Sequence, residues 1–403
     1  MEQASGGINR RGFLKTAAAL TVVVPSVAWG YAANEAVRLG LVGCGGRGPW
    51  VGDLFQKHTN TKVVAVHDFF QDRVDTAGEN LGVEPARRYT GLDGYKELVA
   101  SDVDAVAVIS PPYFHPEQAV AALDGGKHLY LAKPIAVDVP GCTAIVEAAK
   151  RNGAKLSAWV DFQTRMDPLY REAVKRVREG MIGTLVCGQA YYETGRLGLH
   201  ATPGTEPARL RNWVFDKALS GDIIVEQNIH CLDVANWIFG THPVKAHGYG
   251  GRKARTDVGD CWDHFLVTYF YPDGQMLDFH SNQFATGFDD ICARVYGSEG
   301  TIDTHYAGLV KIGSKSGTYP GGIAENLYET GTVANVKDFH ASIVDGKPID
   351  NTQESANSTM TAILGRTAAY SGRDVTWDEV VAANEKLDPK LDLPADAVNS
   401  KPA

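Results

Sequence analysis

Residues 37–48 read Val-Arg-Leu-Gly-Leu-Val-Gly-Cys-Gly-Gly-Arg-Gly, and this stretch decides the fold of the N-terminal half. Its first six residues form a mostly apolar run, which is typical of a buried parallel strand. The next six match G-x-G-x-x-G, and Pro49 suits the first turn of a following helix. Such glycines permit a tight turn and let the backbone approach a pyrophosphate at the helix N-terminus. We therefore expect a dinucleotide to contact Gly43, Gly45, Gly46, Arg47 and Gly48.

An acidic residue stands at the expected distance from this turn. Residues 62–66 predict a second strand that ends in His67 and Asp68, and Asp68 follows Gly48 by twenty positions. A carboxylate there accepts hydrogen bonds from a ribose 2′-hydroxyl and repels a 2′-phosphate, so NAD is favoured over NADP. A glycine turn without a ligand is the alternative. The preceding strand, the following helix and the acid together favour a nucleotide.

Strand and helix patterns alternate up to about residue 160, which predicts a parallel, doubly wound sheet. The ligand of such a sheet lies beyond the carboxyl ends of its strands. The residues that follow predicted strand ends are Asp68, Ser110, Lys133 and Asp161. We assign further cofactor contacts at this edge to Ser110, Pro111, His115, Lys133 and Gln163.

Lys133 is the first catalytic candidate. It comes directly after a predicted buried strand and is followed by Pro134, so its side chain would point into the cofactor crevice. Partial desolvation and nearby positive charge would suit its amine to proton transfer. A surface lysine at a strand end is the alternative that position alone leaves open.

The alternation stops after about residue 161. A helix over 168–179 and a series of β-branched and aromatic runs predict a mostly antiparallel sheet with helices on one face. The other face would be open for a partner subunit or for substrate. We therefore expect an α/β protein, in which a Rossmann domain precedes an α+β domain with a large open sheet. The expected boundaries are 34–160 for the first domain, 161–340 for the second, and 341–403 for helices and a tail that pack back on the body.

The segment 223–239 predicts a helix whose residues Glu226, His230, Asp233 and Trp237 share one stripe. An acid four residues before a histidine can orient its ring and raise its pKa. Glu226 and His230 would then handle a proton beside Lys133. A solvated helix face with an ordinary ion pair is the alternative. A metal site is also conceivable, but the stripe offers no further defined ligand, so we predict no metal.

Candidate substrate contacts are more scattered. The irregular segment 195–213 carries arginines that would face phosphate or sugar hydroxyls, with loop surface charge as the alternative. His264 could reach the site, although a structural role at a strand edge is the alternative. We assign substrate contacts to Arg165, Tyr191, Arg211, Trp213, Asp233 and His264.

The N-terminus reads as a targeting segment. Asn9-Arg10-Arg11-Gly12-Phe13-Leu14-Lys15 precedes a short apolar stretch, 16–24, and small residues follow. This pattern resembles a twin-arginine export signal, which predicts a leader over residues 1–33 and a periplasmic or otherwise exported protein. A chance arginine pair before a short membrane anchor is the alternative. The rest of the chain has no apolar run of about twenty residues and so no predicted membrane span.

Charge and cysteine usage exclude other classes. The 403 residues carry a formal net charge of −9, which argues against broad nucleic-acid binding. The six cysteines are dispersed without a C-x-x-C pair, so they indicate neither a disulfide framework nor a zinc site.

Several stretches are familiar in combination. Besides the glycine turn, they are Ser110-Pro111-Pro112-Tyr113-Phe114-His115, Gly126-Lys127-His128 through Lys133-Pro134, Gly183-Thr184, Glu226-x-x-x-His230-x-x-Asp233, Gly297-Ser298-Glu299-Gly300 and Asp338-Phe339-His340. In this order and spacing the chain resembles the glucose–fructose oxidoreductase / inositol dehydrogenase (Gfo/Idh/MocA) family, from Val37 to about Leu387.

The resemblance implies a Rossmann domain followed by a domain with an open sheet that often serves oligomerisation, and hence a homo-oligomer, a dimer or a tetramer. It implies that Lys133 acts beside the nicotinamide and that Glu226 and His230 supply the other catalytic groups. The substrates would be secondary hydroxyls of sugars, cyclitols or glycosides. Two departures bear on the reaction: Ala132 stands where the family usually has Glu, and Glu226 where many members have Asp.

Three hypotheses follow. The first is an exported oxidoreductase that passes hydride between a carbohydrate hydroxyl and a tightly held NAD. The second is an NAD-dependent glycosidase or lyase that oxidises the sugar ring transiently and releases the aglycone by elimination. The third is a non-catalytic sugar or nucleotide sensor.

Overall fold

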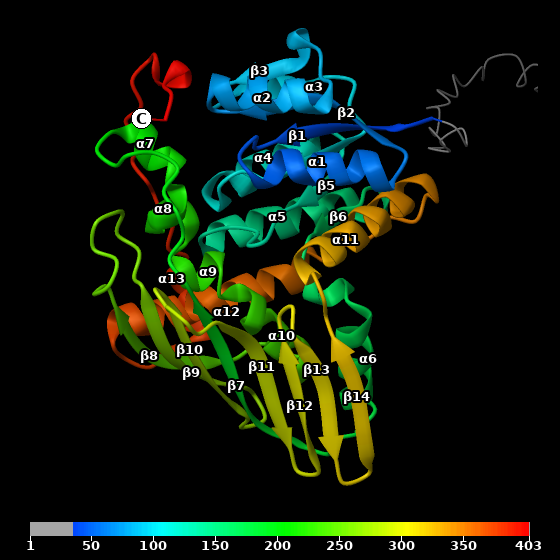
Figure 1. Ribbon diagram of the computed structural model, residues 1–403, viewed down its shortest axis with the longest axis vertical. Coiled ribbons are helices and arrows are strands. Elements are labelled where there is room, and N and C mark those ends of the chain that lie inside the picture. Colours follow the sequence, from blue (N-terminus) through cyan, green and yellow to red (C-terminus); the bar gives the residue numbers. More distant parts are fainter. Residues whose placement is uncertain (1–34, 403) are drawn as a thin grey trace, which may run out of the picture.

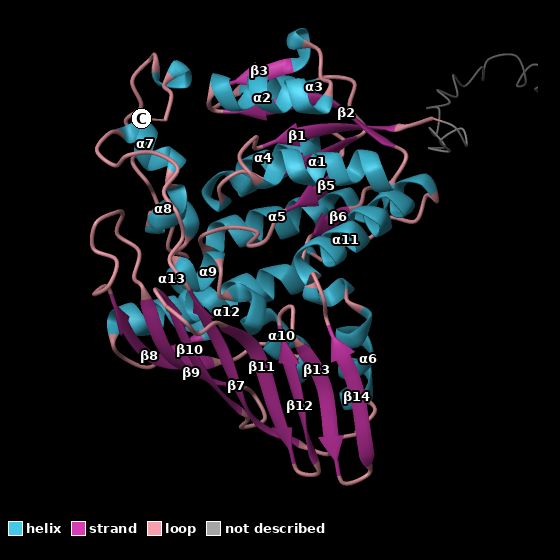
Figure 2. Cartoon of the chain, viewed as in Figure 1, coloured by secondary structure: helices cyan, strands magenta, loops and turns pink. Residues whose placement is uncertain are grey.

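The structure, a computed structural model, describes residues 35–402. Figures 1 and 2 show two sheets, one above the other, with helices around and between them. The upper sheet has six parallel strands in the order β3-β2-β1-β4-β5-β6. Its elements are β1 (Val37–Val42), α1 (Arg47–His58), β2 (Thr61–Asp68), α2 (Gln71–Leu81), β3 (Arg88–Thr90), α3 (Gly94–Ala100), β4 (Ala105–Val108), α4 (His115–Asp124), β5 (His128–Leu131), α5 (Val139–Asn152) and β6 (Ala158–Val160).

This sheet is the doubly wound arrangement that the sequence predicts. Four of the six residues of β1 lie in the apolar core on one face or the other, because helices cover both faces. Helices α1, α2 and α11 (Leu327–Val344) pack on one face, and α3, α4 and α5 pack on the other. The strand order reverses between β1 and β4, and the carboxyl ends of these two strands form the crevice where such sheets bind nucleotides.

The lower sheet has nine strands in the order β14-β13-β12-β11-β7-β10-β9-β8-β15. It is antiparallel as predicted, except that β7 and β10 run parallel at its centre. The strands are β7 (Leu185–Thr194), β8 (Lys245–Gly251), β9 (His264–Phe270), β10 (Met276–Gln283), β11 (Asp290–Gly297), β12 (Gly300–His305), β13 (Leu309–Ser314), β14 (Gly317–Ile323) and β15 (Val375–Thr376). The remaining helices are α6 (Pro168–Arg178), α7 (Glu206–Arg211), α8 (Lys217–Ser220), α9 (Ile223–Glu226), α10 (Ile229–Phe239), α12 (Thr352–Ser371) and α13 (Trp377–Ala383).

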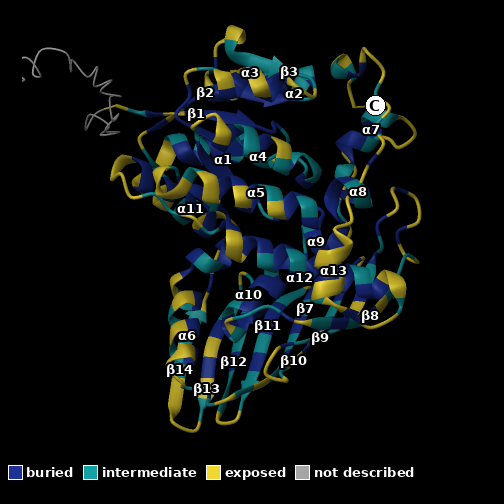
Figure 3. Ribbon diagram, turned by 180° about the vertical axis from the view of Figure 1, so that it is seen from behind, coloured by how far each residue is buried: buried dark blue, intermediate teal, exposed yellow. Residues whose placement is uncertain are grey.

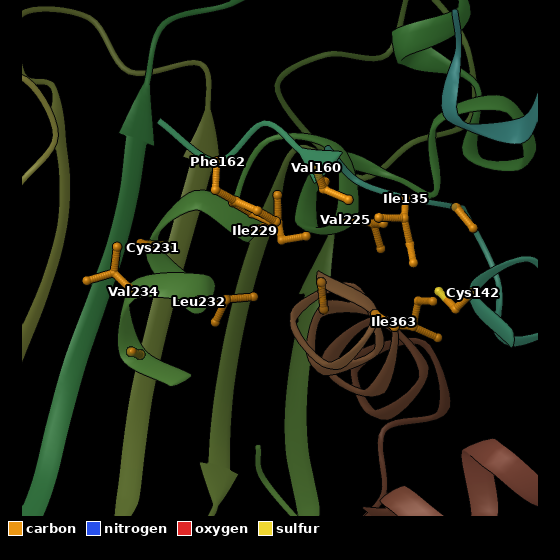
Figure 4. Packing of buried hydrophobic residues seen from close by; sticks show 14 of the residues in the cluster. Ile135, Cys142, Val160, Phe162, Val225, Ile229, Cys231, Leu232, Val234 and Ile363 are labelled. Carbon is orange, nitrogen blue, oxygen red and sulfur yellow. The ribbon is translucent and has the colours of Figure 1, made fainter. Parts of the chain in front are cut away.

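Helices α10 and α12 join the two sheets. They cover the upper face of the lower sheet, and α12 also packs on α5 below the Rossmann sheet. Figure 4 shows Ile229 and Val225 beside Val160 and Ile135, while Ile363 lies near Cys142. The two halves therefore share one apolar core. Figure 3 shows buried residues concentrated in this middle layer and exposed residues along α6 and the edge strand β14.

Two sequence expectations differ from the structure. The single helix expected over 223–239 is interrupted, because Asn228 donates its backbone N–H to Ile223 and the chain turns between α9 and α10. Helix α11 begins at Leu327 and already packs against α1, so the return to the first half precedes the expected boundary at 341. The expected export signal lies outside the described residues. None of the helices within 35–402 is both long enough and apolar enough to cross a membrane.

Candidate active site

The glycine turn between β1 and α1 leaves room for a pyrophosphate. Gly43 has a φ of +97°, and a Cβ atom there would lie 2.5 Å from the backbone of Ile109. A Cβ on Gly48 would lie 1.8 Å from the carbonyl oxygen of Gly43, so the turn closes only with glycine at both positions. A Cβ on Gly46, by contrast, would meet nothing within 4 Å. The space in front of the α1 N-terminus is thus open, and the turn fits a dinucleotide.

Asp68 ends β2 beside the glycine turn, where an acid is expected to hold the adenosine ribose of a dinucleotide, so we name the pocket at this position the adenosine pocket. Its side chain accepts the backbone N–H of Cys44 at 2.8 Å and that of Phe70 at 3.0 Å, which fixes the carboxylate beside the turn. A pocket opens here, lined by Asp68, Phe70, Arg73, Ser110, Pro111 and Leu210 among others. The predicted contacts Asp68, Ser110 and Pro111 therefore lie in one pocket with Gly43.

Lys133 meets Glu226 where the two halves of the chain touch. Lys133 follows β5, and its Nζ donates to the backbone oxygen of Glu226 at 2.5 Å and to its Oε1 at 3.3 Å. The two side chains are only 12% and 14% exposed. Glu226 is the last residue of α9, so the break between α9 and α10 turns its carboxylate towards Lys133 rather than along a stripe with His230.

His115 fixes the turn that carries Lys133. Its Nδ1 lies 2.9 Å from the carbonyl oxygen of Pro134, and its Nε2 lies 2.8 Å from that of Ser110. The ring thereby connects the segments that follow β4 and β5. Burial lowers the pKa of His115 to about 4, so the ring is neutral near pH 7 and its contribution is positional.

His230 is a neutral imidazole at the start of α10. Burial, with the positive charges of Lys133 and Arg47 acting in the same direction, holds its pKa well below 6.5. This corrects the expectation that Glu226 raises the pKa of His230. Its ring centre lies 5.3 Å from that of Tyr306, and its buried Nδ1 has no hydrogen-bond partner among the described residues.

Asp161 accepts hydrogen bonds from three residues next to the turn that carries Lys133. It follows β6, is 1% exposed, and accepts from Arg47 Nη2 at 2.5 Å, from Tyr130 Oη at 3.3 Å and from the backbone N–H of Lys133 at 3.2 Å. The guanidinium of Arg47 also lies near the stacked rings of Trp50 and Tyr328. Asp161 was expected at a strand end but was not assigned to the site. Its carboxylate fixes the backbone of Lys133, while Glu226 provides the carboxylate beside the Lys133 ammonium group.

Gln163 comes after Asp161 and is 1% exposed. Its Nε2 donates to Thr332 at 3.4 Å, while its buried Oε1 has no partner within residues 35–402. Ser110, another predicted cofactor contact, donates from its Oγ to Gln118 at 2.5 Å, and both residues line the pocket beside Asp68.

Arg165 and Asp233 occupy a different cluster from Lys133. Asp233 is fully buried and accepts from Arg165 Nη2 at 2.8 Å, from Arg165 Nε at 2.9 Å and from Ser358 Oγ at 2.6 Å. Arg165 also donates to Glu354 at 2.5 Å. These bonds tie α10 to α12, so the structure gives both residues structural partners instead of the substrate contacts that the sequence suggests.

Within residues 35–402, none of the other predicted substrate contacts forms a hydrogen bond, ion pair or ring contact with Lys133 or His230. Tyr191 is half-buried on β7 between the core residues Ala190 and Tyr192, so it points to the open face of the lower sheet. His264 contacts Asp263 at 2.7 Å, and Asp263 in turn binds the loop before β9. Arg211 and Trp213 lie near the adenosine pocket, because both belong to clusters around Phe70 and Leu210.

One cluster on the open face contains three potential metal ligands. Donor atoms of Asp290, Cys292 and His305 lie within 4.8 Å of one another. Both ring nitrogens of His305 are already close to carboxylates, at 2.8 Å from Asp290 and 3.2 Å from Asp303. These contacts raise the pKa of His305, led by the bond to Asp303, which describes an ion-pair network across β11 and β12.

Comparisons with known proteins agree with this geometry. Residues 37–160 match the model of an oxidoreductase family with an NAD-binding Rossmann fold, and residues 170–303 match the GFO/IDH/MocA C-terminal domain. A scyllo-inositol 2-dehydrogenase (NAD(+)) of Bacillus subtilis (strain 168) is 27% identical over 270 residues, which cover 66% of this chain and 73% of the relative. An inositol 2-dehydrogenase of Acidothermus cellulolyticus is 28% identical over 277 residues, covering 67% and 73%.

Among solved structures, a myo-inositol 2-dehydrogenase from Lactobacillus plantarum superposes with a TM-score of 0.68 at 22% identity, over 85% of this chain and 99% of that one. That likeness concerns the fold. The two family models together cover the Rossmann sheet and the strands β7 to β11 of the lower sheet, and they include Lys133, Glu226 and His230. The chain therefore belongs to the GFO/IDH/MocA family of NAD-binding oxidoreductases.

Proposed function

We propose that the protein oxidises or reduces a secondary hydroxyl of a cyclitol or sugar with NAD as the redox partner. The observation that carries this proposal is the meeting of Lys133 and Glu226, with His230 nearby, at the carboxyl end of the Rossmann sheet. These three side chains can move a proton at the place where the fold binds its nucleotide. The similarity to inositol dehydrogenases supports the substrate class.

The proton chemistry is assigned to groups of this chain. When bound, NAD supplies the nicotinamide ring that accepts a hydride from the carbinol carbon. Oxidation of the alcohol to a ketone also releases the hydroxyl proton, which a base must accept. His230 suits this role because its lowered pKa keeps the ring unprotonated at neutral pH. Lys133, held by two bonds to Glu226, is placed to donate to the substrate oxygen.

Buried polar atoms without partners favour a polyhydroxylated substrate. Such atoms are rare in folded proteins, and several here belong to segments around Lys133 and Glu226. Within residues 35–402 they include Nδ1 of His230, Oδ1 of Asn228, Oε1 of Gln163 and Oε1 of Gln283. Hydroxyl groups of a cyclitol or pyranose could satisfy both donors and acceptors of this kind.

The test is a panel assay with the purified full chain. NAD and, separately, NADP would be offered with inositol isomers, aldoses and 1,5-anhydro sugars, and formation of the reduced cofactor followed by absorbance. We expect turnover with NAD and at least one cyclitol or sugar. Absence of turnover across the panel, in protein that binds NADH, would contradict the proposal.

Redox-neutral glycoside cleavage would begin with the same oxidation and is the second candidate. Nitrophenyl glycosides distinguish it: release of nitrophenol without net formation of NADH would favour cleavage. Accumulation of NADH with intact glycoside would favour simple oxidation.

We also propose export by the twin-arginine route and assembly as a homo-oligomer. The arginine pair at 10–11 and the apolar stretch 16–24 support export, and the uncovered face of the lower sheet supports a second copy as its partner. Signal-dependent appearance in a periplasmic fraction, lost in Arg11→Lys, tests the first. Light scattering of the purified protein tests the second.

A further inference from the structure

The adenosine pocket is not built by the Rossmann half alone. Asp68, Phe70 and Arg73 line it from β2 and α2, and Ser110 and Pro111 line it from the segment after β4. The remaining side includes Leu210 of α7, a residue that is distant in sequence and only 3% exposed. The C-terminal half therefore contributes to a cavity that the glycine motif alone would leave more open.

The C-terminal tail holds this side in place. Figure 1 shows the chain leaving α13, running beside α8 and α7, and ending at a C-terminus beside α7, while the short helical turn at 397–399 contacts α2. Leu391 and Leu393 of the tail pack against a cluster that contains Phe70 and Leu210. The same cluster includes Phe69, Tyr113, Phe114, Trp213 and Leu219. One apolar cluster thus contains residues of the Rossmann half, of the segment α7–α8 and of the tail.

Two arginines of α7 add polar contacts to both neighbours. Arg211 is 3% exposed, lies 3.8 Å above the ring of Phe70, and donates to Asp72 of α2 at 2.8 Å and to the backbone oxygen of Ser400 at 2.5 Å. Arg209 donates to the backbone oxygen of Pro389 at 2.8 Å. Arg211 therefore joins the Rossmann half, α7 and the tail through one buried side chain.

The tail is also attached below the pocket. The backbone N–H of Leu387 donates to Asp138 Oδ2 at 2.9 Å, and Asp138 is the N-terminal cap of α5. Ala397 is 1% exposed, in a short helical turn that contacts α2. The tail is thus anchored to α5 at Leu387, to the cluster around Leu210 at Leu391 and Leu393, and to α2 and α7 at Ala397 to Ser400.

We propose that α7, held in place by residues 387–400 packed against it, forms a third wall of the adenosine site, and that NAD leaves the protein only when this wall of α7 and tail separates from α2. This inference rests on the proposed function insofar as NAD is the cofactor. Release then requires breaking the apolar and arginine contacts of the wall, so the wall would hold NAD tightly, as the export proposed above would require of an NAD enzyme. Wall contacts would slow dissociation more than they alter association.

The direct test is the rate of NADH release from the full chain. Protein loaded with NADH is mixed with excess NAD, and the loss of bound-NADH fluorescence is followed by stopped flow. The variant is Leu391→Ser with Leu393→Ser, and the control is Asp392→Asn with Asp396→Asn, two exposed positions of the same tail. We expect release to accelerate by about tenfold or more in the leucine variant and to be unchanged in the control.

Equal release rates in the two variants and the wild type would overturn the proposal. Circular dichroism and the unfolding midpoint establish that the leucine variant is folded. If it is not, a second measurement on the wild type decides: tryptic cleavage at the exposed Lys386 and Lys390 should slow at least severalfold with saturating NADH. A cleavage rate independent of NADH would overturn the proposal.

Failure of this inference is distinguishable from failure of the proposed function. Unchanged release with carbohydrate turnover would reject the wall and leave the function standing. Faster NADH release in the leucine variant, without turnover of any carbohydrate by the wild type, would support the wall and reject the proposed function. Failure to bind NADH at all would reject both.

Discussion

Replacing Asp233 tests whether this residue is a structural anchor, as its contacts indicate, or a substrate contact, as the sequence pattern suggests. Asp233 is fully buried and accepts bonds from Arg165 and Ser358. Removing one partner of a buried ion pair costs about 3–5 kcal/mol, because the remaining charge is left uncompensated. The side chain of Arg165 is 17% exposed and keeps its contact with Glu354, so we expect the lower end, about 3 kcal/mol, for Asp233→Ala.

The assay is urea unfolding followed by circular dichroism, with kcat/KM measured on the folded protein. The matched control is Glu354→Gln, which removes the charge of the other partner of Arg165. Because the Glu354 side chain is 67% exposed, this change should lower the free energy of unfolding by about 0.5 kcal/mol or less. We expect a large loss of stability for Asp233→Ala with KM changed less than about threefold. A loss below about 1 kcal/mol combined with a tenfold rise in KM would refute the structural reading of this cluster.

Three further predictions follow from the site. His230→Ala should lower kcat by about 10²–10⁴ through loss of a proton acceptor while NADH affinity stays within about twofold, and a matching loss of NADH affinity would contradict the role. Asp161→Asn should weaken the ion pair with Arg47 and the hydrogen bond from the backbone of Lys133. We therefore expect a lower kcat/KM and a kcat at saturating NAD that falls by about tenfold or more. An unchanged kcat would contradict a role of Asp161 in the site. Burial lowers the pKa of His115 from 6.5 to about 4, so between these pH values the unfolded chain binds a proton that the folded chain does not. The contribution of His115 to the free energy of unfolding is therefore fully present above about pH 6.5 and falls by up to about 3 kcal/mol as the pH drops to 4. His115→Gln should flatten this part of the plot of unfolding free energy against pH.

Local patterns predicted the elements that are apolar and regular. Residues 37–42 form a strand with the expected bounds, because a mostly apolar run that ends at a glycine turn leaves few alternatives. Helix α2 was not predicted, since its sequence QDRVDTAGENL buries only a narrow apolar side. Strands β13 and β14 were also missed: β13 is only six residues long, and β14, with three glycines and a proline, is placed by pairing with β13 and not by local preference.

The candidate site was predictable where chain position alone determines it. Lys133 and Asp68 follow strands of a parallel sheet, so their place at the carboxyl edge is a consequence of topology. The stripe that grouped Asp233 with Glu226 and His230 assumed one continuous helix, but the break at Gln227 and Asn228 separates Glu226 from His230 and Asp233, which both lie on α10. At this break the backbone oxygen of Glu226 accepts from Lys133, 93 positions away, and no local pattern indicates that contact.

The wall proposed for the adenosine pocket, formed by α7 and supported by residues 387–400, depends on contacts between residues far apart in the sequence. Arg211 contacts Asp72 and Ser400, which lie 139 and 189 positions away. The arginines of 195–213 were expected to face substrate, whereas Arg211 contacts Phe70, Asp72 and Ser400 in the structure. No periodicity within that segment indicates which distant surface it meets, so their place at the adenosine pocket required the folded structure.

The central claim is hydride transfer to NAD aided by Lys133 and His230, and an isotope experiment tests it most directly. The best substrate of the panel, deuterated at its carbinol carbons, is incubated with NAD and the full chain, and the mass of the recovered cofactor is measured. We predict a reduced cofactor one deuterium heavier than that formed from unlabelled substrate, with formation slowed at least about a hundredfold in Lys133→Met and His230→Ala, both of which still bind NADH. Reduced cofactor without deuterium, or wild-type rates in both variants, would contradict the account.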